Sequence, residues 1–362
     1  MSVESTPKTQ KPKSILRKFG TVVLWFVAIC VVLEIGLRPF GFGSYVIYRP
    51  DERLLWLPMP GTHKLTEQNH RPETISPQGF RYHEVLSLQH PGTYRVFAFG
   101  DSVTMGWGVG DDSNYSAQLE KLLNAQGCGV KAQVISAGVN AYPNALAEER
   151  MIKVVQDGYR PDAVVVAYSA NTGFEGIPDL QGAEREEFLR KVELKSIARH
   201  SALYNFLIED LLRQYAYYRF RELLMLGTWN SAKSSPDLPA SHFLARLEKA
   251  KAVADANHVQ MILLLLGSKG ETYPAHPYQA AMLEYAHANN IPLVNIIELM
   301  RGRNQDEVFM DHVHPTAAGH ALIAEQLLST VKGLDSYEAV CRASSNGSAV
   351  TSLTSPPATS QP

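Results

Sequence analysis

Residues 94–102 read Tyr94-Arg-Val-Phe-Ala-Phe-Gly-Asp-Ser102, an apolar run that ends in a glycine and two polar residues. A short run of β-branched and aromatic side chains bounded by glycine predicts a β-strand. The next periodic stretch, 115–126, has leucines at helical spacing and predicts a helix. We therefore expect a strand, a turn and a helix, the repeating unit of α/β proteins.

The same alternation continues along the chain, with one interruption. Four further strands are predicted at 132–135, 162–168, 259–266 and 291–296. Four further helices are predicted at 144–157, 241–257, 277–290 and 316–332. The strand at 162–168 is apolar throughout, which is typical of a sheet covered on both faces. The pattern therefore predicts an α/β fold with a central parallel sheet and helices on both sides.

Polar residues follow three of the predicted strands. Gly100-Asp101-Ser102 ends the first strand, Ser136-Ala137-Gly138 the second and Ser169-Ala170-Asn171-Thr172 the third. The carboxyl ends of parallel strands meet at one edge of the sheet, where ligands bind. Each group also has a structural interpretation, since Asp and Ser cap helices and Gly and Asn form turns. A strand-to-helix turn would nevertheless present the Ser102 hydroxyl at this edge.

The segment Asp311-His312-Val313-His314-Pro315 precedes the last predicted helix. A serine hydroxyl becomes a nucleophile when a base takes its proton, and that base needs an orienting carboxylate. Asp311 and His314 are spaced to provide both. His312 competes for the role of base, because residues two apart project to the same side of an extended stretch. A metal site is not expected, since no third ligand has suitable spacing.

An acyl-transfer site also needs donors for the negative charge of its tetrahedral intermediate, each worth about 3–4 kcal/mol of barrier. We predict the backbone N–H groups of Ser102 and Gly138 and the side-chain amide of Asn171. No dinucleotide site is expected, because Gly106 and Gly108 are not followed by the third glycine of that motif. We thus expect no cofactor.

With these segments in this order along the chain, the sequence resembles the SGNH hydrolase superfamily, also called GDSL esterases. The resemblance runs from about residue 95 to 328, apart from the interruption at 174–240. Ser102, Gly138 and Asn171 match its first three blocks, and Asp311 with His314 matches its last. The resemblance implies a three-layer flavodoxin-like fold and ester hydrolysis without a metal. It also selects His314 over His312 as the base. The third block departs from the family pattern, which is Gly-x-Asn-Asp.

The N-terminus is predicted to be a membrane anchor. Residues 1–19 are basic, and an apolar run then leads into a span that we place at 20–40. Basic residues before the run favour a cytoplasmic N-terminus, with the rest of the chain periplasmic or extracellular. A cleaved signal peptide and a buried helix are the alternatives. The span and the stretch 75–81 are similar to a single-span membrane-anchored subgroup of the superfamily.

The remaining segments complete the expected organisation. Residues 41–92 are predicted to be a linker and irregular lead-in segment, and 93–333 the main domain. The interruption at 174–240 is predicted to be a helical insert, which packs on the domain or forms a lid beside the site. The Ser/Thr/Pro-rich tail, 334–362, is predicted to be disordered. A Cys128–Cys341 disulfide is an alternative in an oxidising compartment, but it is not expected, because spacing alone does not place the two sulfurs within bonding range.

The expected function is a serine ester hydrolase acting on acylated glycans or lipids of the cell envelope. Two alternatives are an O-acyltransferase to a polysaccharide with the same triad and an inactive glycan-binding module. The 34 Lys and Arg residues balance 36 Asp and Glu residues, so no nucleic-acid partner is expected. The oligomeric state is left open by the sequence.

Overall fold

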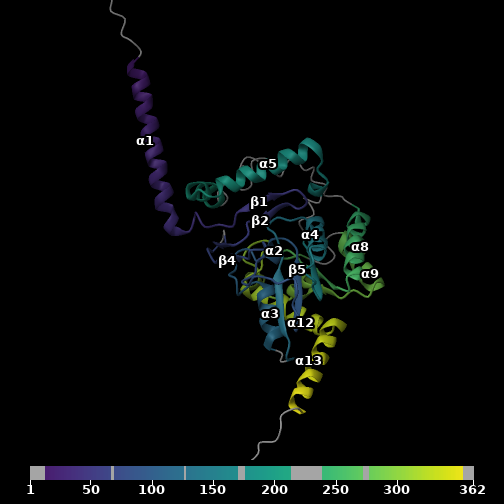
Figure 1. Cartoon of the computed structure of the whole chain (residues 1–362). Helices are drawn as coiled ribbons and strands as arrows, with labels where there is room; N and C mark the ends of the chain where they lie inside the picture. Colours follow the sequence, from purple (N-terminus) through teal and green to yellow (C-terminus); the bar gives the residue numbers. More distant parts are fainter. Residues whose placement is uncertain are drawn as a thin grey trace, which may run out of the picture.

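The computed structural model describes residues 13–66, 69–125, 128–169, 176–212, 239–271 and 277–353. A layered body carries one long helix at its N-terminal end and another at its C-terminal end (Figure 1). The strands are β1 (Tyr48–Asp51), β2 (Leu55–Pro58), β3 (Thr62–Leu65), β4 (Pro72–Ile75), β5 (Thr93–Phe99), β6 (Lys131–Ser136), β7 (Ala163–Tyr168), β8 (Gln260–Leu265) and β9 (Leu293–Asn295).

The helices of the body cover the sheet or connect its strands. They are α2 (Ser102–Met105), α3 (Tyr115–Ala125), α4 (Asn144–Gln156), η3 (Ile177–Asp179), α5 (Gly182–Ala198), α6 (Ala202–Tyr204), η4 (Asn205–Leu212), α8 (Ala240–Ala256), α9 (Pro277–Ala288), α10 (Ile296–Arg301), α11 (Gln305–Val308) and α12 (Ala317–Lys332). The helices at the chain ends are α1 (Lys13–Leu37), followed by η1 (Arg38–Phe40), and α13 (Asp335–Leu353).

The central sheet has five parallel strands in the order β6-β5-β7-β8-β9. Successive side chains of a strand point to opposite faces, so each strand feeds two apolar layers. Phe97 and Val164 pack on one face with residues of α4, α8 and α9. Val96 and Val165 pack on the other face with residues of α3 and α12. The predicted three-layer α/β fold with a parallel sheet is therefore confirmed, and each core element lies within three residues of its predicted limits.

The lead-in segment is more regular than its sequence predicts. β1 pairs with β2 and β3 with β4, both antiparallel. Arg81 then forms isolated bridges to Ile75 of β4 and to Ser136 at the end of β6, which joins this segment to the edge of the main sheet. The expectation of an irregular segment was wrong over these hairpins, because strands of four residues are too short to leave a clear alternation in the sequence.

The helical insert packs on the β1–β2 hairpin. Phe188 of α5 is buried, and its ring lies 5.7 Å from that of Trp56 in β2. Trp56 in turn packs edge-on against Tyr142, which lies in the loop after β6. The insert is thus attached near the carboxyl edge of the sheet, a position that fits both of its interpretations. Residues 213–238 of the insert lie outside the described residues.

The segment after Gly333 is helical where the sequence predicts disorder. α13 occupies Asp335–Leu353, and Tyr337 on its first turn is buried in the α3–α12 layer. Cys341 on the same helix forms a disulfide with Cys128, 213 positions away in the sequence. The prediction was therefore wrong for these residues. Composition alone did not reveal the buried tyrosine and the covalent bond that hold the helix to the body.

The disulfide leads to a stability prediction. Cys341→Ser is expected to lower the free energy of unfolding by roughly 2–5 kcal/mol, because a cross-link over a long loop restricts the unfolded chain. Chemical denaturation without reductant measures this, and Cys30→Ser is the matched control because Cys30 is the free cysteine. Denatured, unreduced wild-type protein should expose one thiol per chain to a thiol reagent, that of Cys30. Three reactive thiols would show that the bond does not form.

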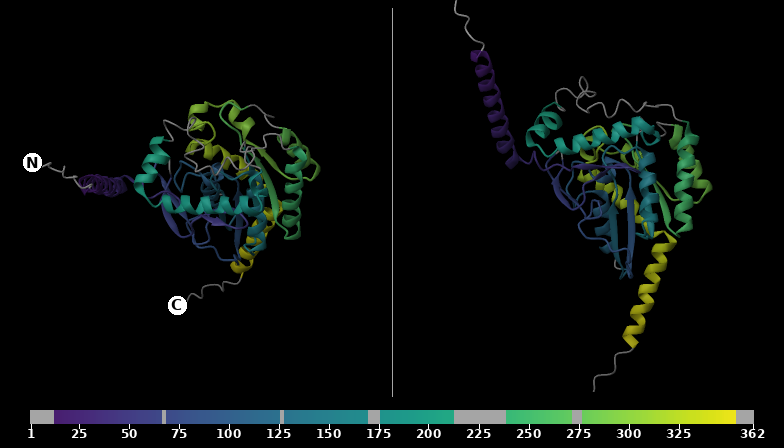
Figure 2. Two further views of the ribbon diagram at one scale, coloured as in Figure 1. Left: turned by 90° about the horizontal axis from the view of Figure 1, so that it is seen from above. Right: turned by 45° about the horizontal axis from the view of Figure 1, so that its top comes forward.

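α1 is an apolar helix that projects from the body and contacts it only near its C-terminal end, among the described residues (Figures 1 and 2). The stretch Arg17–Phe40 has 24 residues, and an 18-residue window within it has a mean hydropathy of 2.4 and is not buried inside the protein. This exposure contradicts the buried-helix alternative. A helix of this length and composition could cross a membrane, and a signal sequence near the N-terminus would have the same properties.

Candidate active site

The candidate nucleophile lies at the turn between β5 and α2. Ser102 is the first residue of α2, and the Asp101 carboxylate caps this helix by accepting a hydrogen bond from the Val103 N–H at 2.9 Å. Gly100 makes the sharp turn feasible, since a Cβ there would lie 2.2 Å from the Thr104 hydroxyl oxygen. Burial raises the pKa of Asp101, although hydrogen bonds from Ser169 and Val103 oppose this. The capping interpretation and the nucleophile interpretation of this turn are therefore compatible.

Ser102, His314 and Asp311 form a continuous chain of hydrogen-bonding groups. Ser102 Oγ lies 2.9 Å from His314 Nε2, and His314 Nδ1 lies 2.8 Å from Asp311 Oδ2. Asp311 Oδ1 accepts hydrogen bonds from the backbone N–H groups of Val313 and His314, at 2.9 and 2.7 Å. These backbone bonds fold the Asp-x-x-His segment into a tight turn. The turn aims the His314 ring at Ser102 across the carboxyl edge of the sheet.

His312, the competing base, faces away from this chain. Its side chain is exposed, and its backbone carbonyl accepts a hydrogen bond from the Lys269 N–H at 2.8 Å. The turn at Asp311 removes the extended geometry in which His312 and His314 would point to the same side. Among the described residues, no group of three His, Cys, Asp or Glu side chains could hold a metal ion.

The carboxylate of Asp311 is held in its ionised form. Burial by itself would raise the pKa of Asp311, but hydrogen bonds from the His314 ring and from the His314 and Val313 N–H groups lower it from 3.8 to about 2. A carboxylate with a lowered pKa in the folded state stabilises the fold above its ordinary pKa. This contribution is lost as the pH falls from about 4 to about 2.

We therefore predict a pH-dependent difference between wild type and Asp311→Asn. The variant should melt at a lower temperature than wild type at pH 7, and the difference should shrink as the pH falls below 3.8 towards 2. Thermal unfolding at stepped pH values measures it. Asp112→Asn, at a side chain that is 88% exposed, should follow wild type throughout. A difference in melting temperature between Asp311→Asn and wild type that stays the same at every pH would contradict the prediction.

Gly138 lies against the backbone of the nucleophile turn. A Cβ at this position would lie 2.2 Å from Met105 N and 2.8 Å from Asp101 O, so only glycine fits without displacing the turn. Within the described residues, neither the Ser102 nor the Gly138 N–H donates a hydrogen bond to a protein acceptor. Both groups are thus available to a bound oxyanion. Asn171, the third predicted donor, lies outside the described residues.

Gly138→Ala is expected to damage both stability and catalysis. The added methyl group collides with backbone atoms, and overpacking of this kind costs about 1–3 kcal/mol. Displacing the Ser102 turn by about 1 Å would lower the turnover rate by roughly a hundredfold. Chemical denaturation and ester hydrolysis measure the two effects. Gly302→Ala is the control, because nothing lies within 4 Å of a Cβ there. Equal behaviour of the two variants would contradict the prediction.

Two residues that the sequence did not single out complete the site. The Trp107 ring lies 4.2 Å from the His314 ring and is nearly fully buried. It covers one face of the candidate base. The backbone N–H of Trp107 also donates a hydrogen bond to the Ser102 carbonyl at 2.9 Å. The sequence feature that could have identified Trp107 is its place between Gly106 and Gly108, just after the candidate nucleophile.

Arg81 is the second missed residue, although it lies in the lead-in stretch 75–81. Its guanidinium is buried and donates to the carbonyls of Met105, Gly106 and Val109, each at 2.7 Å. These carbonyls belong to the loop that follows Ser102 and contains Trp107. The lead-in segment therefore supports the candidate nucleophile loop through a buried charge, and its pairing with Asp111 at 3.2 Å supplies a counter-ion.

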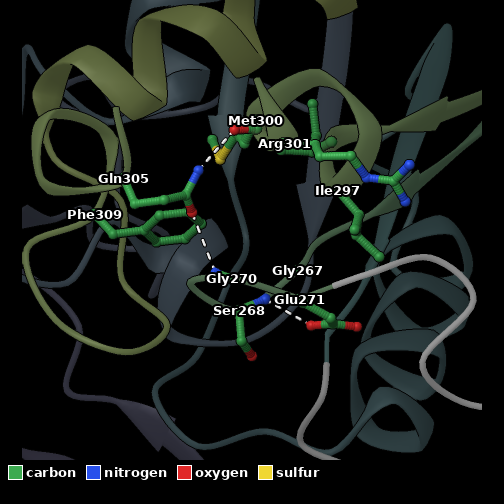
Figure 3. A pocket seen from close by; sticks show the side chains of 10 residues that line it. Gly267, Ser268, Gly270, Glu271, Ile297, Met300, Arg301, Gln305 and Phe309 are labelled. Atoms are coloured by element: carbon green, nitrogen blue, oxygen red, sulfur yellow. Dashed lines mark hydrogen bonds between the residues drawn. The ribbon is translucent and has the colours of Figure 1, made fainter. Parts of the chain in front are cut away.

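A pocket lies beside the Asp311 turn (Figure 3). It is lined by the loop after β8 together with residues of α10 and the Gln305–Phe309 segment. Gln305 bridges it by donating to Met300 O and accepting from the Gly270 N–H. Among the described residues that line it, none belongs to the Ser102–His314–Asp311 chain.

Comparisons with known proteins identify a family and several similar structures. The model of the GDSL-like lipase/acylhydrolase family matches residues 98–322. No curated protein matches the chain. Similar solved structures include a lipase/acylhydrolase from Enterococcus faecalis, with 18% identity over 66% of this chain and 96% of that chain and a TM-score of 0.41. The acetylxylan esterase Axe2 from Geobacillus stearothermophilus has 15% identity over 67% and 95%, with a TM-score of 0.40. A GDSL-like lipase from Bacteroides thetaiotaomicron has 15% identity over 71% and 93%, with a TM-score of 0.39.

Proposed function

The chain belongs to the GDSL-like lipase/acylhydrolase family and is therefore a hydrolase of ester bonds, and from this premise we propose that Ser102, His314 and Asp311 are its catalytic triad. The observation that carries the proposal is the aligned geometry of the three side chains, with 2.9 Å from Ser102 Oγ to His314 Nε2 and 2.8 Å from His314 Nδ1 to Asp311 Oδ2. The first distance allows a proton to pass from Ser102 to His314, and the second allows Asp311 to orient the His314 ring.

The mechanism proceeds through an acyl-enzyme. His314 Nε2 takes the Ser102 proton as Oγ attacks the ester carbonyl, and Asp311 accepts a hydrogen bond from Nδ1–H and stabilises the imidazolium. The N–H groups of Ser102 and Gly138, with the Asn171 amide, hold the oxyanion. His314 then protonates the leaving alcohol. Water, deprotonated by His314, attacks the acyl-enzyme and releases the acid.

We further propose that α1 anchors the enzyme in a membrane. The apolar stretch Arg17–Phe40 is unburied, and the basic residues before it favour a cytoplasmic N-terminus. The catalytic domain then lies in the periplasm or outside the cell, where a disulfide such as Cys128–Cys341 can persist. Retention of the full-length protein in membranes after an alkaline carbonate wash supports this anchor. Release of full-length protein contradicts it.

The substrate class that fits this placement is an acylated glycan or lipid of the cell envelope. Transfer of the acyl group to a polysaccharide hydroxyl uses the same acyl-enzyme and is the second candidate function. The two differ in the group that accepts the acyl chain. Incubating the enzyme with an activated acetyl ester and a glycan acceptor separates them, because hydrolysis yields acetate and transfer yields an acetylated glycan.

Activity-based labelling tests the core of the proposal. A fluorophosphonate probe should label wild type at Ser102, identified by mass spectrometry of the tryptic peptide, and should not label Ser102→Ala. A series of p-nitrophenyl esters of increasing chain length then reports which acyl group the site accepts. A folded wild-type protein that is not labelled at Ser102 would favour an inactive glycan-binding module and overturn the proposal.

A further inference from the structure

The end of α1 is bound directly to the helical insert. The Glu34 carboxylate accepts hydrogen bonds from the Ser201 hydroxyl at 2.7 Å and from the N–H groups of Ala202 and Leu203 at 3.0 and 2.9 Å. Arg38, one turn later, pairs with the same carboxylate at 2.7 Å. Glu34 thus satisfies the free N–H groups at the start of α6. In both figures the α6–η4 end of the insert lies beside the end of α1.

Further contacts fix the chain that leaves α1 to the same part of the insert. The Tyr45 hydroxyl donates to the Asp210 carboxylate in η4 at 2.7 Å. The Arg199 guanidinium donates to the Val46 carbonyl at 2.7 Å. Hydrogen bonds at the end of α1 and within the α1–β1 connection therefore hold the part of the insert from Arg199 to η4. These contacts set the orientation of the body relative to α1.

The position of Glu34 along α1 sets the depth of this junction. Arg17 and Glu34 are 17 positions apart, and a rise of about 1.5 Å per residue separates them by about 26 Å. The hydrocarbon core of a bilayer is about 30 Å thick. Charged residues at both ends of the span lie at its boundaries, so Glu34 lies near the outer boundary. α6, which Glu34 caps, must then lie at the level of the lipid headgroups.

Exposed apolar side chains are found on the described elements next to this junction. Ile197 and Leu194 of α5 are 64% and 48% exposed and lie three positions apart, on one face. Leu207 and Leu211 of η4 are 39% and 41% exposed. Phe40, directly after α1, is 69% exposed. We name these five residues the interfacial patch. The insert lies on the side of the body towards which α1 projects (Figure 2).

We infer that the interfacial patch lies in the headgroup layer of the membrane that α1 spans, so that the body rests on the lipid surface in one orientation. The inference rests on the proposed anchor. The partner is a lipid surface, because Phe40 follows the span closely, Glu34 at the end of the span caps α6 beside η4, and exposed apolar residues at this depth gain burial in lipid. Phe188 and Trp56 connect the same insert to the carboxyl edge of the sheet. The edge of the sheet that carries Ser102 therefore faces the bilayer, and the enzyme binds its substrate close to the lipid surface.

Site-specific quenching tests this placement. The full-length protein carries Cys30→Ala, keeps its disulfide and receives one bimane-labelled cysteine at a time. It is reconstituted in phosphatidylcholine–phosphatidylglycerol vesicles that contain a lipid with a nitroxide near the headgroup end of its acyl chain or, for position 27, near the methyl end of that chain. Ile197→Cys and Leu207→Cys report on the patch. Val85→Cys and Leu88→Cys are matched controls, since these residues are 69% and 51% exposed and lie in the segment before β5. Val27→Cys, within α1, reports on the span.

The expected result is loss of most of the fluorescence at 197, 207 and 27, with little loss at 85 and 88. Quenching at 27 together with control-level signals at 197 and 207 overturns the inference and leaves the anchor standing. No quenching at 27 overturns the anchor and the inference together. Esterase activity of the same vesicles is measured in parallel, so that failure of the proposed catalytic function is seen separately.

Discussion

Ser102→Ala is expected to lower the turnover of p-nitrophenyl acetate by about 10⁴- to 10⁶-fold, and the larger value is the loss found when the serine of a triad is removed in another enzyme. The larger value corresponds to about 8 kcal/mol of lost transition-state stabilisation. The loss is large because no acyl-enzyme forms without the hydroxyl, and His314 then has no nucleophile to activate. The residual rate would come from the oxyanion donors and from binding alone.

The measurement is initial-rate kinetics with the wild type and the variant at matched concentration. Ser113→Ala is the control, since Ser113 lies on the same loop after the nucleophile and its backbone N–H bonds Gly110 O. The melting temperature of Ser102→Ala should stay close to that of wild type, which shows that the lost activity is chemical. Undiminished hydrolysis by a folded Ser102→Ala protein would refute the assignment of the nucleophile.

The two histidines of the Asp311–Pro315 segment are expected to differ sharply. His314→Ala should lose about as much turnover as Ser102→Ala, because the base and the nucleophile act as one unit. The double variant should therefore be no slower than either single variant. His312→Ala should stay within about twofold of wild type, because the exposed ring takes no part and surface substitutions usually have small effects.

Kinetics of the three variants on one ester separate the two candidate bases. His312→Ala serves as the control for His314→Ala, since both remove an imidazole from the same turn. Additive losses in the Ser102–His314 double variant would mean that the two residues act independently. A large loss for His312→Ala alone would show that the exposed ring enters the site in solution and that the turn at Asp311 is not kept.

Local patterns in the sequence were sufficient for the sheet and its helices. Strand and helix periodicities depend on side chains a few positions apart, so the five strands from β5 to β9 and the helices between them could be predicted. Placing Ser102, Gly138 and the Asp311 segment at one edge needed only the rule that parallel strands end together. The resemblance to a known superfamily then selected His314.

Only the tertiary structure decided the contacts between distant parts of the chain. It joins Cys128 to Cys341, places Arg81 behind the candidate nucleophile loop and binds Glu34 to the start of α6. None of these pairs has a characteristic spacing, because each depends on how separate elements pack. The sequence by itself determined the architecture and the groups available for chemistry. The packing determined which histidine reaches Ser102, what holds its loop, and how the body is oriented on its anchor.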